Sequence, residues 1–199
     1  GDRVLRGQLI AEPSGLGANI HASYTGEVTA VTETDIVIKA DDKQNFDEYV
    51  KIPDTKTNLE AIAAAGVVGA GGAGFPTAVK LKTEIPQGCF IANCAECEPL
   101  LAHNIHQIET DAAQLVRGVK YAMEITKAPK GYIAIKPKHK KAVIELIKAC
   151  RNEDNIDVFR LPDMYPAGDE RVIVREVMGI ELEPGQLPGT VGACIDNAE

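Results

Sequence analysis

Three short apolar runs separated by two helix-like segments constrain the fold of this chain more than any other feature. The runs Phe90–Ala92, Tyr132–Ile135 and Val158–Leu161 have the length and composition of buried central strands. In each intervening segment, apolar residues recur at three- and four-residue steps, as on the buried face of a helix. These residues are Ile108, Ala112, Leu115, Val119 and Ala122 in the first segment and Ala142, Val143, Leu146 and Ile147 in the second. The order predicts an α/β domain with a parallel sheet.

The first forty residues follow a different pattern. Short aliphatic runs alternate with turn residues such as Gly7, Gly26 and the Pro13–Gly17 stretch, which predicts a small all-β module. Polar breaks at 41–45 and 53–58 favour a division into domains 1–48 and 49–199. Asn58 is expected to cap a helix over 59–65 that ends at Gly66, and 169–178 should form another that ends at Gly179.

Charge and composition exclude several functions. The chain has 21 Lys and Arg against 29 Asp and Glu, a net charge of −8, and no basic run, so nucleic acid is not an expected partner. The longest apolar run, 59–74, consists largely of alanine and glycine, so direct membrane insertion is not expected either. Five cysteines at irregular spacing favour a reducing, cytoplasmic location. The chain begins with Gly1, so we expect a fragment of a longer protein.

The segment 69–80 is the richest in glycine. Gly69, Gly71, Gly72 and Gly74 allow close approach to a ligand, and Lys80, one turn into the following helix, could neutralise a phosphate. The segment satisfies Gly-x-Gly-x-x-Gly, but helix-forming residues precede it instead of a strand, so the match to a dinucleotide fingerprint is weak. A packing turn without a ligand is the alternative.

A second segment follows the first predicted strand directly. Asn93, Glu96 and Glu98 would lie at the carboxyl end of a parallel strand, where such sheets bind ligands. Cys94 and Cys97 form a Cys-x-x-Cys pair, which leaves open a redox pair, half of a metal site with His103 and His106, or two unpaired thiols. The spacing matches no standard zinc pattern, so we expect no metal.

A third segment, 165–171, begins the last predicted helix. Gly168, Asp169 and Glu170 suit a helix start by themselves, and Tyr165 offers a flat face to an aromatic ring. The residues Ile195–Glu199 indicate nothing alone.

Taken in order, these four segments resemble the flavin-binding domain of RnfC, the component of the Rnf complex that is related to the NADH-binding 51 kDa subunit of respiratory complex I. The resemblance rests on Gly-x-Gly-Gly-Ala-Gly-Phe-Pro-Thr-x-x-Lys at 69–80, Asn-x-Ala-Glu-Cys-Glu-Pro at 93–99, Tyr-Pro-x-Gly-x-Glu at 165–170 and Asp-Asn at 196–197. It implies a Rossmann-like sheet domain that binds FMN non-covalently, with the phosphate near the glycine segment. The implied FMN residues are Gly69, Gly71, Gly72, Gly74, Lys80, Asn93, Glu96, Tyr165, Gly168, Asp169, Glu170 and Asn197. Those implied for NADH are Phe75, Glu98 and Glu170, and no side chain is expected to act as a catalytic acid or base.

The first residues, Gly1–Gln8, resemble the start of lipoyl and biotinyl domains, which have a barrel-sandwich fold. The lysine that carries their cofactor is absent, since Pro13–Gly17 stands in its place, so we expect a docking or structural module. Cys94, Asp169, Asp196 and Ala198 depart from the Rnf pattern. Cys94 favours a specialised branch, such as the electron-transfer proteins associated with proline reductase, whereas Asp169 and Asp196 favour a degenerate flavin site. An acid at 196 is unfavourable beside an anionic reduced flavin.

The resemblance implies that hydride passes from NADH to FMN and that electrons continue to 4Fe-4S clusters. The 199 residues contain no ferredoxin-like cysteine run, so the clusters are expected downstream of Glu199. Implied partners are NADH and other subunits of an electron-transfer complex, at the cytoplasmic face of a membrane. Two alternatives remain: a non-catalytic docking domain with a degenerate flavin site, and a thiol relay at Cys94 and Cys97.

Overall fold

The chain forms two compact units in the computed structural model, which describes residues 1–69, 73–98 and 100–198. The N-terminal unit comprises Gly1–Val68 and Phe75–Ala78, and the sheet unit comprises Gly69–Gly74 and Val79–Glu199. Helix α1 (Asn58–Ala65) belongs to the N-terminal unit, although the predicted second domain includes it. The predicted boundary between residues 48 and 49 stays a prediction.

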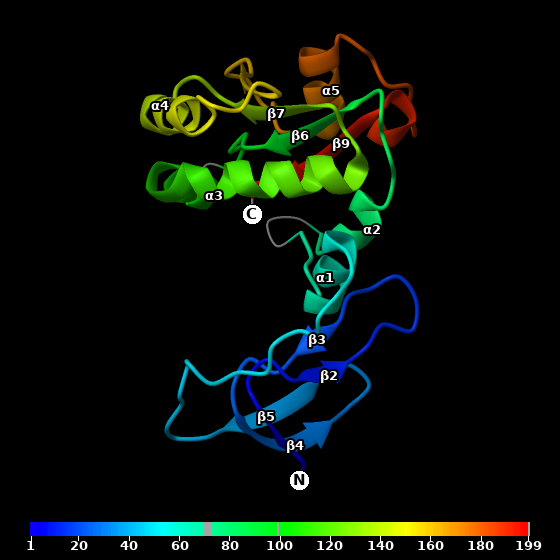
Figure 1. Ribbon diagram of the computed structural model, residues 1–199, viewed down its shortest axis with the longest axis vertical. Helices are drawn as coiled ribbons and strands as arrows, with labels where there is room; N and C mark the ends of the chain where they lie inside the picture. Colours follow the sequence, from blue (N-terminus) through cyan, green and yellow to red (C-terminus); the bar gives the residue numbers. More distant parts are fainter. Residues whose placement is uncertain (70–72, 99, 199) are drawn as a thin grey trace. The chain divides into compact units, whose positions relative to one another are not determined.

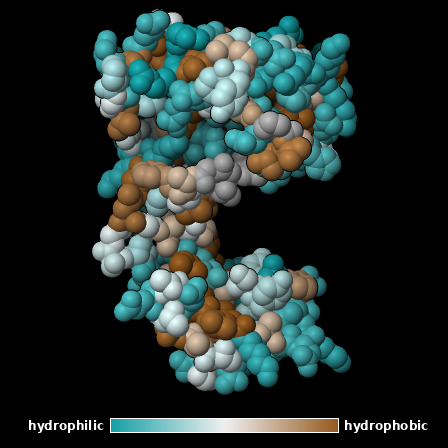
Figure 2. Space-filling view, turned by 180° about the vertical axis from the view of Figure 1, so that it is seen from behind, coloured by the Kyte–Doolittle hydropathy of each residue, from teal (hydrophilic) through white to brown (hydrophobic). Residues whose placement is uncertain are grey.

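The N-terminal unit is built from short antiparallel strands, which confirms the predicted all-β module (Figure 1). One sheet has the order β1-β4-β5 and the other pairs β2 with β3. The strands are β1 (Arg3–Val4), β2 (Leu9–Ala11), β3 (Ile20–His21), β4 (Gly26–Val31) and β5 (Ile36–Ala40). Several aliphatic side chains of this unit, including Ile20 and Val31, are exposed, and apolar surface is visible on it in Figure 2.

The cap of helix α1 lies one residue earlier than the sequence suggested. Thr57, not Asn58, is the N-cap, because Thr57 is extended and its side chain accepts a hydrogen bond from the Glu60 N–H at 3.2 Å. Two adjacent residues of good capping chemistry made this prediction wrong by one position. Gly66 ends the helix as predicted, in the left-handed conformation with φ of 68°.

The sheet unit contains a four-stranded parallel sheet in the order β8-β7-β6-β9. The three predicted strands are confirmed within one or two residues, a helix lies in each of the two predicted intervening segments, and α5 ends at Gly179 as predicted. Strand β9, which pairs with β6, was not predicted. The elements that follow α1 along the chain are α2 (Thr77–Leu81), β6 (Cys89–Asn93), α3 (His103–Thr126), β7 (Lys130–Ile135), α4 (Lys140–Ala149), β8 (Ile156–Arg160), α5 (Glu170–Met178), the 3-10 helix η1 (Pro188–Val191) and β9 (Ala193–Asn197).

Helices cover both faces of this sheet. Ile173 and Val174 of α5 pack in one cluster with Ile91 of β6 and Ile195 of β9, while α3 lies on the opposite side (Figure 1). Ile91, Ile173 and Val174 have no exposed surface. In the described part of the chain, no helix is both long and apolar enough to cross a membrane.

Two glycines allow β9 to enter beside β6. A Cβ atom at Gly88 would lie 1.9 Å from the carbonyl oxygen of Gly192, so no larger residue fits there. The close approach lets the Cys89 N–H donate to the Gly192 carbonyl at 2.9 Å. The register that follows places Asn93 directly beside Asn197 at the carboxyl ends of the two strands.

Candidate functional site

A pocket of about 340 Å³ lies at the carboxyl edge of the sheet. Its wall comes from the segment after β6, the start of α3, the segment before α5, and the end of β9. The residues predicted to bind a flavin or nicotinamide that line it are Asn93, Glu96, Glu98, Tyr165, Gly168, Asp169 and Asn197. The fold thus brings together residues that are up to 104 positions apart in the sequence.

Asn93 connects three parts of the pocket wall. Its Nδ2 donates to the Gly168 carbonyl at 3.0 Å and to Asn197 Oδ1 at 3.3 Å, while its Oδ1 accepts from the Ala95 N–H at 3.1 Å. An amide side chain is suited to this position because it donates and accepts at once. Asn93 therefore fixes the segment before α5 against β6 and β9.

Cys97 holds Gly168 from its other side. The Gly168 N–H donates to Cys97 Sγ at 3.2 Å, and a Cβ at Gly168 would lie 3.1 Å from both that sulfur and the Ala95 carbonyl oxygen. The next residue, Asp169, is the N-cap of α5 and accepts from the Arg171 N–H at 2.9 Å. The predicted alternative for this segment, helix capping, is thus present together with the pocket.

Lys80 and two carboxylates form a charged cluster beside the sheet. Lys80 Nζ lies 3.2 Å from Glu170 Oε1 and 3.7 Å from Asp196 Oδ1. Burial raises the pKa of Asp196, and the Lys80 ammonium only partly offsets that effect. Lys80 and Glu170 are among the residues implied for FMN; neither is among the residues that line the pocket. Their contact with a cofactor stays a prediction.

The glycine segment is described only in part. Gly71 and Gly72 lie outside the described residues. The Gly74 N–H donates to the Gly69 carbonyl at 3.2 Å, and Gly74 has a φ of 68° that other residues rarely adopt. Phe75 belongs to the N-terminal unit, where its side chain is 42% exposed. Phosphate binding by this segment and nucleotide binding by Phe75 stay predictions.

The cysteines differ in accessibility. Cys94 has no exposed surface, and burial raises the pKa of its thiol. Cys97 is half-buried, and both thiols are free. A buried thiol with a raised pKa is a poor nucleophile, which disfavours a thiol relay between Cys94 and Cys97. The relay stays an alternative prediction. Among the described residues, no group of three or more His, Cys, Asp or Glu side chains could hold a metal ion.

Two residues near the pocket were missed by sequence reasoning. Asn104 lines the pocket from the first turn of α3, and its Nδ2 donates to Glu96 Oε2 at 3.4 Å. Lys136, directly after β7, is 4% exposed and donates from Nζ to the Glu96 carbonyl at 3.1 Å. Their places at a helix start and at the end of a predicted strand were the available signals.

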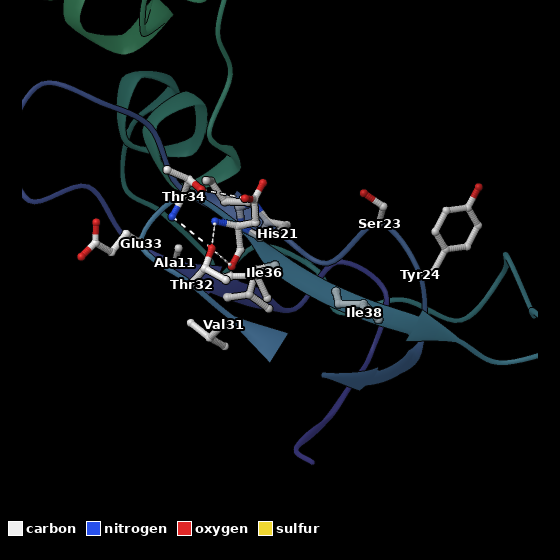
Figure 3. A pocket seen from close by; sticks show the side chains of 13 residues that line it. Ala11, His21, Ser23, Tyr24, Val31, Thr32, Glu33, Thr34, Ile36 and Ile38 are labelled. Atoms are coloured by element: carbon white, nitrogen blue, oxygen red, sulfur yellow. Dashed lines mark hydrogen bonds between the residues drawn. The ribbon is translucent and has the colours of Figure 1, made fainter. Parts of the chain in front are cut away.

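The N-terminal unit has a pocket of its own, of about 620 Å³, between its short strands (Figure 3). Isoleucines from β2, β3 and β5 form much of its wall, and a turn closed by the Asp35 N–H donating to Thr32 Oγ1 at 2.9 Å lies at its rim. The residues that line it are Ile10, Ala11, Ile20, His21, Ser23, Tyr24, Val31, Thr32, Glu33, Thr34, Asp35, Ile36 and Ile38. None of them is a lysine, the residue that a swinging cofactor arm requires.

Comparison with known proteins agrees with this architecture. Residues 1–48 match the RnfC barrel sandwich hybrid domain, and residues 62–199 match the Nuo51 FMN-binding domain. The C subunit of the Na⁺-translocating ferredoxin:NAD⁺ oxidoreductase complex from Acetobacterium woodii is 35% identical over 99% of this chain and 48% of its own length. Cobalamin reductase PduS from Salmonella typhimurium is 44% identical over 70% of this chain and 30% of its own length.

A crystal structure of an NAD⁺-reducing [NiFe]-hydrogenase in the H₂-reduced state has a similar fold. Its TM-score is 0.61 at 21% identity, over 70% of this chain and 28% of that chain. The chain thus spans about half the length, or less, of these relatives. The match over 62–199 covers the whole parallel sheet and the pocket at its edge. The chain belongs to the Nuo51 FMN-binding domain family and carries an N-terminal RnfC barrel sandwich hybrid domain.

Proposed function

We propose that this chain binds FMN in the pocket at the carboxyl edge of its sheet and forms the NADH-reacting part of an RnfC-like electron-transfer protein. The observation that carries this proposal is the convergence of Asn93, Glu96, Gly168 and Asn197 on one pocket. When bound, FMN accepts a hydride from NADH and releases electrons singly. The acceptors proposed for those electrons are 4Fe-4S clusters in the remainder of a longer protein.

The pocket fits such a ligand in size and in chemistry. Its volume of about 340 Å³ lies in the range of small-molecule sites. Amide groups of Asn93 and Asn197 supply donors and acceptors, and Asn104 Oδ1 is a buried acceptor with no partner among the described residues. Glu98 lies at the same wall, where we place the nicotinamide nucleotide, and Tyr165, which is 76% exposed there, offers its ring to the flavin.

Replacement of Lys80 distinguishes FMN binding from a purely structural role of this chain. In the proposal, its ammonium leaves Glu170 and Asp196 in part to meet the phosphate of FMN. Titration of the full chain with FMN, followed by flavin fluorescence, should give saturable binding that Lys80→Ala weakens at least tenfold. Lys82→Ala, an exposed lysine two residues along, is the matched control and should bind as the wild type does. Absence of FMN binding at high micromolar concentration would refute the proposal.

A docking role for the N-terminal unit is a second candidate, favoured by its open apolar pocket. The two roles are compatible, but a docking domain with a degenerate flavin site would bind no FMN. In that case Lys80→Ala would leave binding of a partner protein unchanged. The first proposal includes the reaction with NADH, the transfer of electrons to 4Fe-4S clusters, and a position at the cytoplasmic face of a membrane.

A further inference from the structure

Lys136 is a buried cation that no ion pair explains. In the described part of the chain it is the one buried lysine or arginine, with 4% of its surface exposed. An ammonium group has three N–H donors. Among the described residues, the ammonium of Lys136 makes one hydrogen bond, to the Glu96 carbonyl at 3.1 Å. No described carboxylate lies within 4.0 Å of its Nζ atom. Burying a charge in this way is costly unless something else compensates it.

The register of the sheet places this cation behind the wall of the flavin pocket. Asn93 of β6 pairs with Ala134 of β7, so Lys136, two residues further on, lies level with Ala95 and Glu96. The carbonyl group that it holds belongs to Glu96, which lines the pocket. One hydrogen bond therefore separates the ammonium from the pocket wall.

The pocket itself has the opposite charge. Glu96, Glu98 and Asp169 line it, and its described lining includes no lysine or arginine. Nearby, Lys80 is occupied by Glu170 and Asp196. The pKa of His139 is lowered, first by burial and then by Lys138 and Lys136, so this imidazole adds little positive charge at neutral pH. The carboxylates that line the pocket disfavour a further negative charge there, and Lys136 is the buried cation next to its wall.

We propose that Lys136 compensates for these carboxylates and selectively stabilises the anionic reduced form of the flavin, an inference that rests on the proposed function. In the reaction concerned, the C4–H bond of the dihydronicotinamide breaks and an N5–H bond of the flavin forms. The hydride carries two electrons and one proton, so the products are NAD⁺ and a reduced flavin with one negative charge. Lys136 acts on this balance through its charge and needs no contact with the reacting atoms.

The test is the midpoint potential of FMN bound to the full chain, measured anaerobically against a reference dye. Lys136→Met removes the charge and keeps an apolar chain of similar length, whereas Lys136→Gln also keeps a donor for the Glu96 carbonyl. In both, the preference for reduced over oxidised FMN should fall on the order of tenfold, the effect of one partly screened unit charge, which lowers the potential by about 30 mV. Lys136→Arg should stay near the wild type.

Lys138→Gln is the matched control, because Lys138 is exposed and pairs with Asp163 at 3.1 Å. It removes the same charge two residues away and should leave the potential unchanged. A merely structural Lys136 would weaken both redox forms equally, so an unchanged potential in Lys136→Met and Lys136→Gln overturns this inference alone. A wild-type chain that binds no FMN overturns the proposed function and the inference with it.

Discussion

Replacing Asn93 by alanine should loosen the edge of the sheet that forms the pocket. The substitution removes three hydrogen bonds, at 3.0 and 3.3 Å from Nδ2 and at 3.1 Å to Oδ1. Each such bond contributes about 0.5–1.5 kcal/mol net, and the half-buried position lets water replace part of that contribution. We therefore expect the free energy of unfolding of the sheet unit to fall by about 2–3 kcal/mol.

Urea denaturation followed by circular dichroism measures this change, with a Tm lower by roughly 4–12 °C as its thermal counterpart. Asn155→Ala is the control, because Asn155 is exposed and its side chain makes no hydrogen bond to the described residues. It should alter stability by less than about 0.5 kcal/mol. Equal midpoints for the two variants would refute the assignment of Asn93 as the residue that joins the pocket walls.

Three further predictions concern charge, packing and thiol chemistry. Burial raises the pKa of Asp196, so the folded state binds a proton on this carboxylate more tightly than the unfolded state does. The Asp196→Asn variant should therefore be at least as stable as the wild type at pH 7, and any gain in its urea midpoint should vanish as the pH falls towards about 4. Gly88→Ala should destabilise the sheet unit by more than about 2 kcal/mol, because its Cβ would lie 1.9 Å from the Gly192 carbonyl oxygen. Gly118→Ala, on the exposed side of α3, should instead stabilise the unit by about 0.5–1 kcal/mol, and similar effects of the two changes on thermal unfolding would contradict this prediction. When the protein reacts with iodoacetamide at about pH 8, Cys97 should be labelled first, because burial raises the pKa of Cys89 and Cys150 to about 11 and that of Cys194 to about 12. Peptide mass spectrometry measures the order of labelling, and labelling of Cys94 as fast as Cys97 would instead favour the thiol relay.

The elements of the sheet unit were predictable where their apolar residues are periodic or form an uninterrupted run. The steps from Ile108 to Ala122 define the buried face of α3, and the apolar run at Tyr132–Ile135 defines a strand buried on both faces. Strand β9 includes the polar residues Asp196 and Asn197 and pairs with a strand about a hundred positions earlier. A short run that ends in polar residues does not distinguish a strand from a loop, and nothing local encodes a parallel partner.

The candidate site was predictable to the extent that its chemistry lies in short motifs. Asn93, Glu96 and Gly168 were found because they follow or precede clear elements, and all three line one pocket. Lys136 was missed because lysine is rarely buried, so a lysine after a strand suggests a solvated loop. Its importance depends on the three carboxylates that the fold assembles around the pocket, which no single segment contains.

The position of β9 links the packing of the sheet to the chemistry of its edge. Asn197 reaches the pocket because β9 lies beside β6, and β9 can do so because Gly88 and Gly192 approach each other without side chains. The same strand carries Asp196, whose carboxylate lies 3.7 Å from Lys80 Nζ. An amide that completes the pocket and an acid that pairs with Lys80 are therefore adjacent residues on one strand. Because successive side chains of a strand point to opposite faces, a shift of β9 by one residue would exchange their places, so the glycine contact also fixes which of the two side chains lines the pocket.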